Sequence, residues 1–236
     1  MKDCHLINLA GERLLALPSG VLFMERQQAL VVSDLHFGKS ERNSRRGGPL
    51  LPPFETRDTM ARLEADIVRT DAKTVVCLGD SFDDTDAGHN LPESDRQWLA
   101  RLQTGRTWIW VEGNHDPGAM NLGGQHVQEA RIGALTLRHI ARPGETKEIS
   151  GHFHPKFTLN ARGTRISRRC FVHDDNRVVL PAYGTFTGGM DCLEPELRGL
   201  FANDAFAVTT GQEARVFPLP PARSATRPRL RRGSPG

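Results

Sequence analysis

Three short apolar runs rich in β-branched residues stand out in the first half of the chain, and each is followed within a few residues by polar side chains. They span residues 29–32, 74–78 and 107–111, and their length and composition predict buried strands. Apolar residues at helical spacing predict helices over residues 54–69 and 93–103 between them. This alternation predicts an α/β fold in which ligands bind beyond the carboxyl ends of the strands.

The second half of the chain has a different pattern, with short β-prone segments separated by Gly, Asn, Asp and Pro. These segments predict further strands, at residues 134–138, 165–172, 177–180, 205–209 and 214–217. Two more strand candidates near the start, residues 4–9 and 21–24, are expected at a sheet edge. Trp108 and Trp110 are expected to pack the core from opposite faces of their strand. The chain shows no internal repeat and no linker before Pro218, so residues 1–217 are expected to form a single domain.

Composition places the chain among ordinary globular enzymes. It has 236 residues, enough for a sizeable buried core. Its four cysteines are isolated in sequence, which favours reduced thiols over a disulfide framework or a zinc knuckle. The start lacks a basic and then apolar leader, and no apolar stretch is long enough to span a bilayer. We therefore expect a cytoplasmic protein that does not associate with a membrane.

Charge is distributed unevenly along the chain. The formal net charge is +3, and residues 218–236 contain five arginines and no acidic residue, so the remainder is close to neutral. This Pro-, Arg- and Ser-rich segment lacks the apolar content needed to pack, and we expect a disordered tail over residues 218–236. The alternative is an arm whose arginines contact nucleic-acid phosphates, with an affinity that falls as salt rises.

Five short motifs with metal-binding side chains follow one another in a fixed order. They are Asp34-Leu35-His36, Gly79-Asp80, Gly113-Asn114-His115-Asp116, a single His139, and Gly151-His152-Phe153-His154. Together they offer carboxylate, amide and imidazole ligands without thiolate, which suits divalent ions such as manganese, iron or zinc. Seven such ligands and an extra histidine are what a two-metal hydrolytic site requires. The candidate ligands are Asp34, His36, Asp80, Asn114, His139, His152 and His154.

Each piece of this pattern has a structural alternative when taken alone. Asp34 and Asp80 are also suited to helix N-caps, and Asn114 to a turn. His139 could be an ordinary core or surface histidine, and the histidines outside the motifs, His5, His89, His126 and His173, are assigned to structure or solvent. Two ligands separated by one residue reach one site only where the backbone turns. We expect the neighbouring Gly38, Gly113 and Gly151 to permit these turns.

The ordered set of motifs resembles that of the calcineurin-like metallophosphoesterases, over about residues 29–190. This resemblance implies a four-layer α/β/β/α sandwich with a dinuclear metal centre at one edge. It also implies the ligand sets: Asp34, His36 and His154 for one ion, Asn114, His139 and His152 for the other, with Asp80 bridging both. His115 is expected just outside the coordination sphere, held by Asp116, and these two are the expected catalytic residues.

A hydrolytic mechanism follows from the chemistry of paired ions. Two divalent ions about 3.5–4 Å apart can clamp the attacking and the leaving oxygen of an in-line displacement. The expected nucleophile is a metal-bridging hydroxide, and His115 as an imidazolium would stabilise developing charge or protonate the leaving oxygen. Manganese is the expected metal, with iron or zinc as alternatives.

Two further segments resemble a bacterial subgroup, the ligase-associated DNA damage response endonucleases. One is residues 34–39, which run into a basic stretch, and the other is residues 179–189, preceded by residues 168–171. The resemblance implies a phosphodiester-hydrolysing nuclease in DNA repair, with DNA as a partner and association with a DNA ligase or helicase. One departure is Asp83, where similar proteins are expected to carry a histidine.

The basic stretch contains the candidate substrate-binding residues Lys39, Arg42, Arg45 and Arg46. We expect it to be flexible and to contact phosphodiesters, the alternative being a solvated charged loop. The same metal set also serves a small-molecule phosphoesterase or a pyrophosphohydrolase acting on a nucleotide-linked substrate, which is the alternative function. A third possibility is a metal-stabilised scaffold with little catalysis of its own.

Overall fold

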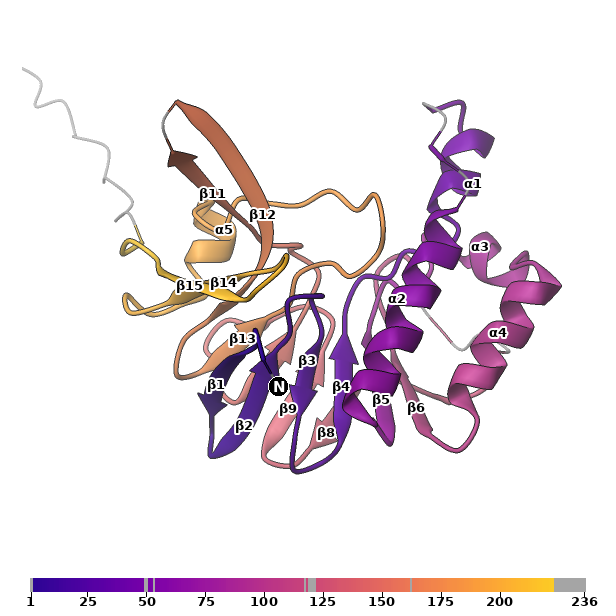
Figure 1. Cartoon of the computed structure of the whole chain (residues 1–236), viewed down its shortest axis with the longest axis horizontal. Coiled ribbons are helices and arrows are strands. Elements are labelled where there is room, and N and C mark those ends of the chain that lie inside the picture. The colour runs from indigo at the N-terminus through magenta and orange to yellow at the C-terminus, as the bar shows by residue number, and fades with distance from the viewer. Residues whose placement is uncertain are drawn as a thin grey trace, which may run out of the picture.

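The computed structural model describes residues 2–48, 51–52, 54–116, 118, 122–161 and 163–222 (Figure 1). Within these residues, two sheets pack face to face. The first sheet has the order β1-β2-β3-β4-β5-β6-β7. Its strands are β1 (His5–Leu9), β2 (Glu12–Ala16), β3 (Leu22–Met24), β4 (Ala29–Val32), β5 (Thr74–Leu78), β6 (Thr107–Val111) and β7 (Gln125–Val127).

The second sheet has the order β15-β14-β12-β13-β10-β9-β8, and β11 pairs with β12 beside this path. Its strands are β8 (Glu129–Ile132), β9 (Leu135–Arg138), β10 (Glu148–Ser150), β11 (Lys156–Ala161), β12 (Thr164–His173), β13 (Arg177–Val179), β14 (Phe206–Thr209) and β15 (Arg215–Pro218). The β11–β12 hairpin projects beyond the sheet at the upper left of Figure 1. The second sheet therefore provides both half of the core and an extended arm.

Helices cover the outer faces of both sheets. The described helices are α1 (Lys39–Arg45), α2 (Glu55–Thr70), α3 (Thr85–His89), α4 (Glu93–Gln103) and α5 (Pro195–Arg198), of which α1 has no buried residue. Leu63 of α2 and Leu99 of α4 pack with Val75 on the outer face of the first sheet, and a second apolar cluster fills the space between the sheets. The third cluster places Leu197 of the single-turn helix α5 on the outer face of the second sheet. The predicted α/β/β/α layering is confirmed, with a thin outer layer at α5.

Parallel pairing brings the carboxyl ends of five strands to one edge of the sandwich. β4, β5 and β6 are parallel neighbours in the first sheet, and β9 and β10 are parallel neighbours in the second. Buried apolar side chains such as Val31 and Val76 hold the first group against Leu137 and Ile149 of the second. Since each of these strands is followed by one of the polar motifs, the fold collects the motifs at the edge where β4 ends, which is the upper end of that strand in Figure 1.

Two sequence expectations about local structure need correction. Trp108 and Trp110 lie on the same side of β6, in one core cluster with ring centroids 5.5 Å apart, because residues two apart in a strand share a face. The basic stretch after His36 is not flexible coil but forms α1.

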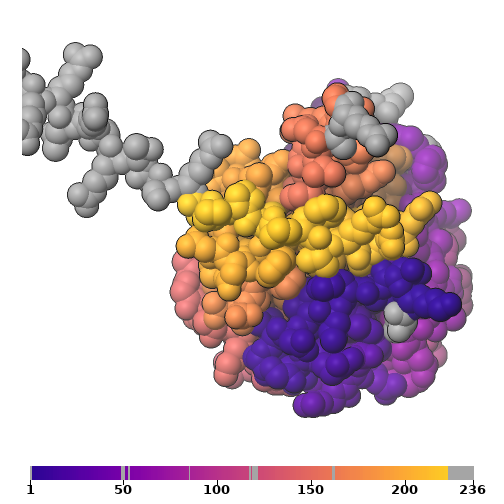
Figure 2. All heavy atoms as spheres, turned by 60° about the vertical axis from the view of Figure 1, so that its left-hand side comes forward, coloured from indigo at the N-terminus to yellow at the C-terminus, as the bar shows by residue number. Residues whose placement is uncertain are grey.

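The C-terminal strands pack against the start of the chain. Figure 2 shows the β14–β15 segment lying along the N-terminal strands, where the backbone N–H of Ala214 donates to the carbonyl of Asp3 at 2.9 Å. The folded part extends beyond residue 217, since β15 includes Pro218 and Leu219 is buried with its N–H bonded to the carbonyl of Ala205 at 2.9 Å. Residues 223–236, which hold the arginines of the expected tail, lie outside the described residues. None of the described helices is long and apolar enough to cross a bilayer.

Candidate dinuclear metal centre

The strand ends deliver the candidate ligands in two groups. Asp34 and His36 follow β4, Asp80 follows β5 and Asn114 follows β6. From the second sheet, His139 follows β9, and His152 and His154 follow β10. Backbone bonds lock these loops together: the N–H groups of Asp34 and His36 donate to the carbonyls of Gly79 and Asp80, at 3.2 and 2.9 Å.

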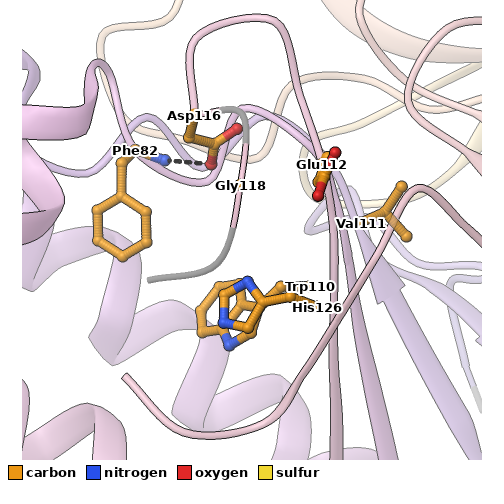
Figure 3. A pocket seen from close by; sticks show the side chains of 7 residues that line it. All are labelled: Phe82, Trp110, Val111, Glu112, Asp116, Gly118 and His126. Atoms are coloured by element: carbon orange, nitrogen blue, oxygen red, sulfur yellow. Dashed lines mark hydrogen bonds between the residues drawn. The ribbon is translucent and has the colours of Figure 1, made fainter. Parts of the chain in front are cut away.

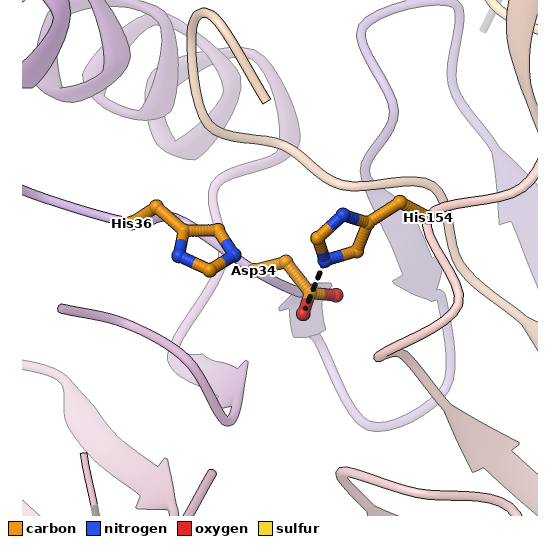
Figure 4. A group of neighbouring side chains, drawn as sticks. All are labelled: Asp34, His36 and His154. Atoms are coloured by element: carbon orange, nitrogen blue, oxygen red, sulfur yellow. Dashed lines mark ion pairs between the residues drawn. The ribbon is translucent and has the colours of Figure 1, made fainter. Parts of the chain in front are cut away.

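The first group consists of Asp34, His36 and His154, whose candidate ligand atoms lie within 4.8 Å of one another (Figure 4). His154 Nε2 is 2.9 Å from Asp34 Oδ1, and the rings of His36 and His154 meet edge to face with centroids 5.3 Å apart. His36 Nε2 is buried and forms no hydrogen bond within the described residues, while Asp34 Oδ1 and His154 Nε2 are buried and have their mutual ion pair as their contact there. Because buried polar atoms rarely lack a partner, a divalent cation fits as a common partner of these three atoms.

The second group gathers around His139 Nε2. Asn114 Oδ1 lies 3.0 Å from it, His152 Nδ1 3.2 Å and Asp80 Oδ2 3.4 Å. The other ring nitrogen of His139 donates to the carbonyl of Leu78 at 2.8 Å, which fixes the ring and directs Nε2 into the group. Asp80, His139 and His152 again have candidate ligand atoms within 4.8 Å of one another. Two adjacent sites of oxygen and nitrogen donors are thus preformed.

Opposite charges within the site shift the pKa values of its carboxylate and histidine side chains. Burial raises the pKa of Asp80, but hydrogen bonds and charge from His139 and His115 outweigh burial and lower that pKa to about 2. Burial lowers the pKa of His139, but Asp80 and Asp34 together raise it to about 9. Asp34 is fully buried, yet His154 holds its pKa below the ordinary value. The carboxylates are therefore ionised at neutral pH, and His139 must lose a proton to act as a metal ligand.

The ligand side chains converge because the ligands themselves adopt left-handed backbone conformations. Asp34, His36, Asp80, His152 and His154 have φ angles between 46° and 70°. Such angles are rare for non-glycine residues and are retained at functional sites when the surrounding structure enforces them. In each Asp-x-His or His-x-His pair, the left-handed backbone of the two ligands therefore directs both side chains into the site.

The neighbouring glycines serve mainly a different purpose from the one expected. Gly38 has a positive φ of 79°, but Gly113 and Gly151 do not have left-handed conformations. A Cβ atom at Gly151 would lie 1.6 Å from Ser33 Oγ, and one at Gly113 would lie 2.1 Å from the backbone nitrogen of Asp80. Gly113 and Gly151 are required because the loops of different strands approach one another closely.

Asp116 supports the site but does not hold His115, contrary to the expectation from sequence. Its buried carboxylate accepts hydrogen bonds from the backbone nitrogens of Asp80, Ser81 and Phe82, at 3.0, 2.7 and 3.1 Å, and Figure 3 shows the last of these. Burial and the charge of Asp80 raise the pKa of Asp116 to about 6, although the backbone hydrogen bonds oppose this shift. The role of Asp116 is to fix the loop that carries Asp80.

His115 is held instead by the backbone carbonyl of Asp83, which lies 3.0 Å from His115 Nδ1. A carbonyl only accepts, so Nδ1 carries the proton and Nε2 faces the site, 4.0 Å from Asp80 Oδ2. The ring also meets His36 edge to face, with centroids 5.4 Å apart. The half-buried His115 can therefore hold or release a proton at Nε2 beside both ligand groups.

Asp83 has a role that the sequence did not reveal. Its side chain is buried, and Oδ1 lies 2.9 Å from His36 Nδ1 while Oδ2 accepts from Arg42 at 2.8 Å. A carboxylate on the far nitrogen of a ligand histidine orients the ring and raises its basicity. Burial alone would raise the pKa of Asp83, but His36, Arg42 and Lys39 hold it well below its usual range. The signal available in the sequence was the departure from histidine at this position.

The predicted substrate-binding cations largely pair with acidic side chains. Lys39 and Arg42 contact Asp83, and Arg45 contacts Asp84 at 3.0 Å. Arg46 follows α1 and forms no ion pair within the described residues. Phosphate binding by these four residues remains a prediction, and the geometry shows Arg42 and Lys39 supporting His36 through Asp83.

The segment over residues 179–189 begins with the last residue of β13 and continues as a loop next to the first ligand group. The N–H of Gly184 donates to the carbonyl of Asp34 at 3.0 Å, and the N–H of Met190 donates to that of His154 at 3.2 Å. Arg169 lies under the loop and donates to the carbonyls of Ala182 and Gly184, at 3.1 and 2.8 Å. The resemblance described from sequence drew attention to residues 168–171 and 179–189. It did not indicate that Arg169 holds the loop, or that the loop is bonded to the backbone of Asp34.

The chain belongs to the calcineurin-like phosphoesterase family, whose sequence profile matches residues 28–185. A solved structure similar to this one is the crystal structure of Pseudomonas putida nuclease MPE. The match has a TM-score of 0.72 and 28% sequence identity, and it covers 92% of this chain and 100% of that chain. No curated protein matches the chain. Fold, ligand groups and family together define a metal-dependent phosphoesterase.

The residues present fit two divalent cations: Asp34, His36 and His154 would hold one, and Asp80, Asn114, His139 and His152 would hold the other. When bound, such cations supply Lewis acidity toward a phosphoryl group. The chain itself contributes rigid positioning, because the Asp116 carboxylate, the Leu78 carbonyl and Asp83 fix three of the loops or rings. His115 contributes a proton donor or acceptor at Nε2, suited to a leaving oxygen.

Proposed function

We propose that the protein is a nuclease that hydrolyses phosphodiester bonds of DNA. The observation that carries this proposal is the similarity to a nuclease over nearly all of both chains, combined with the preformed pair of ligand groups. The similarity includes the regions outside the shared family profile, since the profile ends at residue 185 and the structural match covers 92% of the chain.

The surroundings of the ligand groups support a long substrate. Both α1 and the β11–β12 hairpin project past the edge where the ligands lie (Figure 1). By strand alternation, the hairpin face that carries Arg169 also carries the exposed Arg165 and the hydroxyls of Thr158 and Ser167. Arginine and hydroxyl side chains are common donors to nucleic-acid phosphates. A polymeric phosphodiester could contact such a projecting arm, whereas a small phosphomonoester would not need one.

We extend the proposal to manganese as the native metal. The oxygen and nitrogen donor set, without thiolate, suits this ion, although it also suits iron and zinc. Metal analysis of the purified protein, followed by removal of the metal and restoration with each ion separately, tests this part. Activity restored fully by zinc or iron and not by manganese would reject it.

The test of function compares three substrates with the manganese-loaded protein: single-stranded DNA, a phosphodiester dye ester and a pyrophosphate. We expect cleavage of DNA and of the dye ester, with products mapped on a defined strand. Asp80→Asn and His115→Ala should abolish or strongly reduce both activities, and Arg13→Ala, on the distant β2 strand, should leave them unchanged. Activity confined to the pyrophosphate would overturn the proposal.

We further propose that the protein acts in DNA repair in the cytoplasm, in association with a DNA ligase or helicase. It rests on the resemblance of residues 34–39 and 179–189 to ligase-associated endonucleases. Cells lacking this protein should be sensitised to DNA-breaking agents, and Asp80→Asn should fail to restore resistance. Full restoration by Asp80→Asn would mean that catalysis is not its task in the cell.

A further inference from the structure

Two phenylalanine rings are exposed together close to the first ligand group. Phe54 is 54% exposed and Phe186 is 38% exposed, and their ring centroids lie 5.9 Å apart. They come from distant parts of the chain, one at the start of α2 and the other in the loop after β13. Neighbouring exposed apolar side chains that form a contiguous patch, unlike scattered single ones, commonly mark a binding surface.

The loop that carries Phe186 is fixed on both sides of this residue. Thr185 accepts a hydrogen bond from Arg62 at 3.0 Å and donates from its backbone to Thr59 at 3.1 Å, so it is tied to α2. Thr187 is buried, and its hydroxyl donates to the carbonyl of Gly184 at 2.8 Å. The exposed ring is therefore held by rigid neighbours and does not depend on its own burial for its position.

Phe186 also has a strained backbone. Its φ is 59°, in the left-handed region that bulky residues without a local hydrogen-bonding side chain rarely occupy. Glycine would remove this strain, and glycines are present at the nearby positions 184, 188 and 189. A phenylalanine with a strained backbone and an exposed ring contributes little to folding, and strain of this kind is typical of functional positions.

Both rings originate beside the metal ligands. Gly184 is bonded to the backbone of Asp34, and Phe186 follows it by two residues, a span of at most about 7 Å. On the other side, Thr56 accepts a hydrogen bond from the N–H of Gly38 at 2.9 Å, two residues after His36. Phe54 precedes Thr56 by the same distance along the chain. The aromatic pair thus borders the segment that connects Asp34 to Gly38.

We propose that Phe186 and Phe54 form a stacking platform for an unpaired nucleobase of the strand whose phosphodiester lies at the metal centre. Because the two ring planes are tilted by 58°, the base stacks on one ring and its edge contacts the other. This inference rests on the proposed nuclease function and names its substrate class as single-stranded or locally unpaired DNA. Aromatic rings bind unpaired bases with little sequence preference because every base offers a flat face. Paired bases inside a duplex do not expose that face, so the platform selects against intact double strands.

The test uses the manganese-loaded enzyme and two single strands of equal length. One has a mixed base sequence, and the other has the same number of phosphodiesters but abasic tetrahydrofuran residues in place of internal nucleotides. The wild-type enzyme should prefer the base-containing strand through a lower KM. Phe186→Ala and Phe54→Ala should each raise KM for that strand by about 5- to 150-fold. Neither should change kcat, or KM for the abasic strand, by more than about twofold.

Phe206→Ala is the matched control. Phe206 is 36% exposed and also stacks on another ring, that of His173, but it lies in β14, away from the ligand loops. It should leave both KM values unchanged. Phe186→Trp keeps a flat aromatic surface and should retain the preference for bases, a result that a purely structural role of the ring would not produce.

The outcomes separate this inference from the function on which it rests. A wild-type enzyme that cleaves neither strand contradicts the nuclease proposal and the platform with it. A wild-type enzyme that cleaves both strands with equal KM contradicts the platform alone. So do variants that lose activity equally on both strands, or that keep the preference for bases. If Phe186→Ala fails to fold, Phe54→Ala decides the question, because Phe54 lies outside the strained loop.

Discussion

Asp83 shows how much of the metal centre depends on a side chain that is not itself a candidate ligand. Its carboxylate connects His36 to the cations of α1, at 2.9 Å from His36 Nδ1 and 2.8 Å from Arg42. Asp83→Asn keeps the size but removes the negative charge. Loss of such a partner typically weakens metal binding about 10- to 100-fold. We expect weaker binding of one of two manganese ions in calorimetric titration of the metal-free protein.

The matched control for this prediction is Asp84→Asn. Asp84 pairs with Arg45 and caps α3 by accepting from the N–H of Ala87 at 2.8 Å, and asparagine can maintain the cap. Both manganese affinities should stay at wild-type values in this variant. An Asp83→Asn protein that binds two ions as tightly as wild type would show that His36 does not need the carboxylate.

At this scale the sequence identifies residue types but not their contacts. The ligands are recognisable because Asp34, Asp80 and His139 follow apolar strands in a fixed order. The partner of Asp116 was not predictable, because its carboxylate reaches residues 80–82, more than thirty positions away, through the pairing of β5 with β6. The left-handed conformations of the ligands were equally hidden, since no local preference of Asp or His requires them.

Among the elements, the loop over residues 179–189 has the clearest consequence for the metal centre. A Cβ atom at Gly184 would lie 2.1 Å from the carbonyl oxygen of Leu35, which is backbone and cannot move aside. Gly184→Ala should therefore displace the segment carrying Asp34 and His36. We expect a lower melting temperature and loss of one high-affinity manganese site, measured by differential scanning calorimetry and by metal content after dialysis.

Gly188→Ala is the control for this loop. A Cβ atom at Gly188 meets nothing within 4 Å, and its φ is not positive. Melting temperature and metal content should both match the wild type. Equal behaviour of the two alanine variants would mean that the loop can shift without disturbing the ligands.

The β11–β12 hairpin allows substrate size to be tested at the level of an element. Replacing residues 158–167 by Asn-Gly would join Phe157 to Arg168 through a two-residue turn, a favoured hairpin connection. The metal centre and the packed part of β12 remain intact, so hydrolysis of a phosphodiester dye ester should persist. KM for a DNA strand should rise about tenfold or more through lost backbone contacts. Unchanged KM for DNA would assign the arm to another purpose.

The elements predicted from sequence are those with a local signal, either an apolar run, a β-prone segment or apolar residues at helical spacing. The helix expected over residues 93–103 has the observed bounds, and the three central strands are present. β10 was missed because it is three residues long and begins with Glu148, a buried carboxylate neutralised by Arg138 and Arg177. Only the tertiary ion pairs make that position compatible with a core strand.

For the whole molecule, the important property is that the metal centre spans two sheets. Asp34 and Asp80 come from the first sheet, and His139, His152 and His154 come from the second. Between the sheets, a continuous apolar cluster fixes their relative position. Neither sheet holds a complete ligand group alone, so metal binding and the docking of the sheets must stabilise each other. Family resemblance predicted this architecture, whereas the local sequence pattern predicted strands in both halves of the chain but not the packing of two sheets against each other.

His173 links the same two sheets at a site remote from the metals and makes stability depend on pH. Its ring lies 6.0 Å from that of His5 in β1 and stacks on Phe206 at 5.7 Å. Burial, with a further contribution from the charge of His5, lowers the pKa of His173 from 6.5 to about 4, although Asp174 opposes the shift. Between these pH values His173 binds more protons in the unfolded chain than in the folded chain. Its contribution to the free energy of unfolding is therefore fully present above about pH 6.5 and is lost as the pH falls toward 4.

His173→Phe removes this titration while keeping a flat ring against Phe206. By pH 4.5 the wild type should lose about 2 to 3 kcal/mol that the variant retains, measured as the difference in urea unfolding free energy between pH 7 and pH 4.5. The carboxylates and the ligand histidines titrate in both proteins and cancel in this comparison. His89→Phe, at an exposed position ending α3, should lose as much stability as the wild type. Equal losses in wild type and His173→Phe would mean that His173 takes up its proton without disturbing the contact between the two sheets.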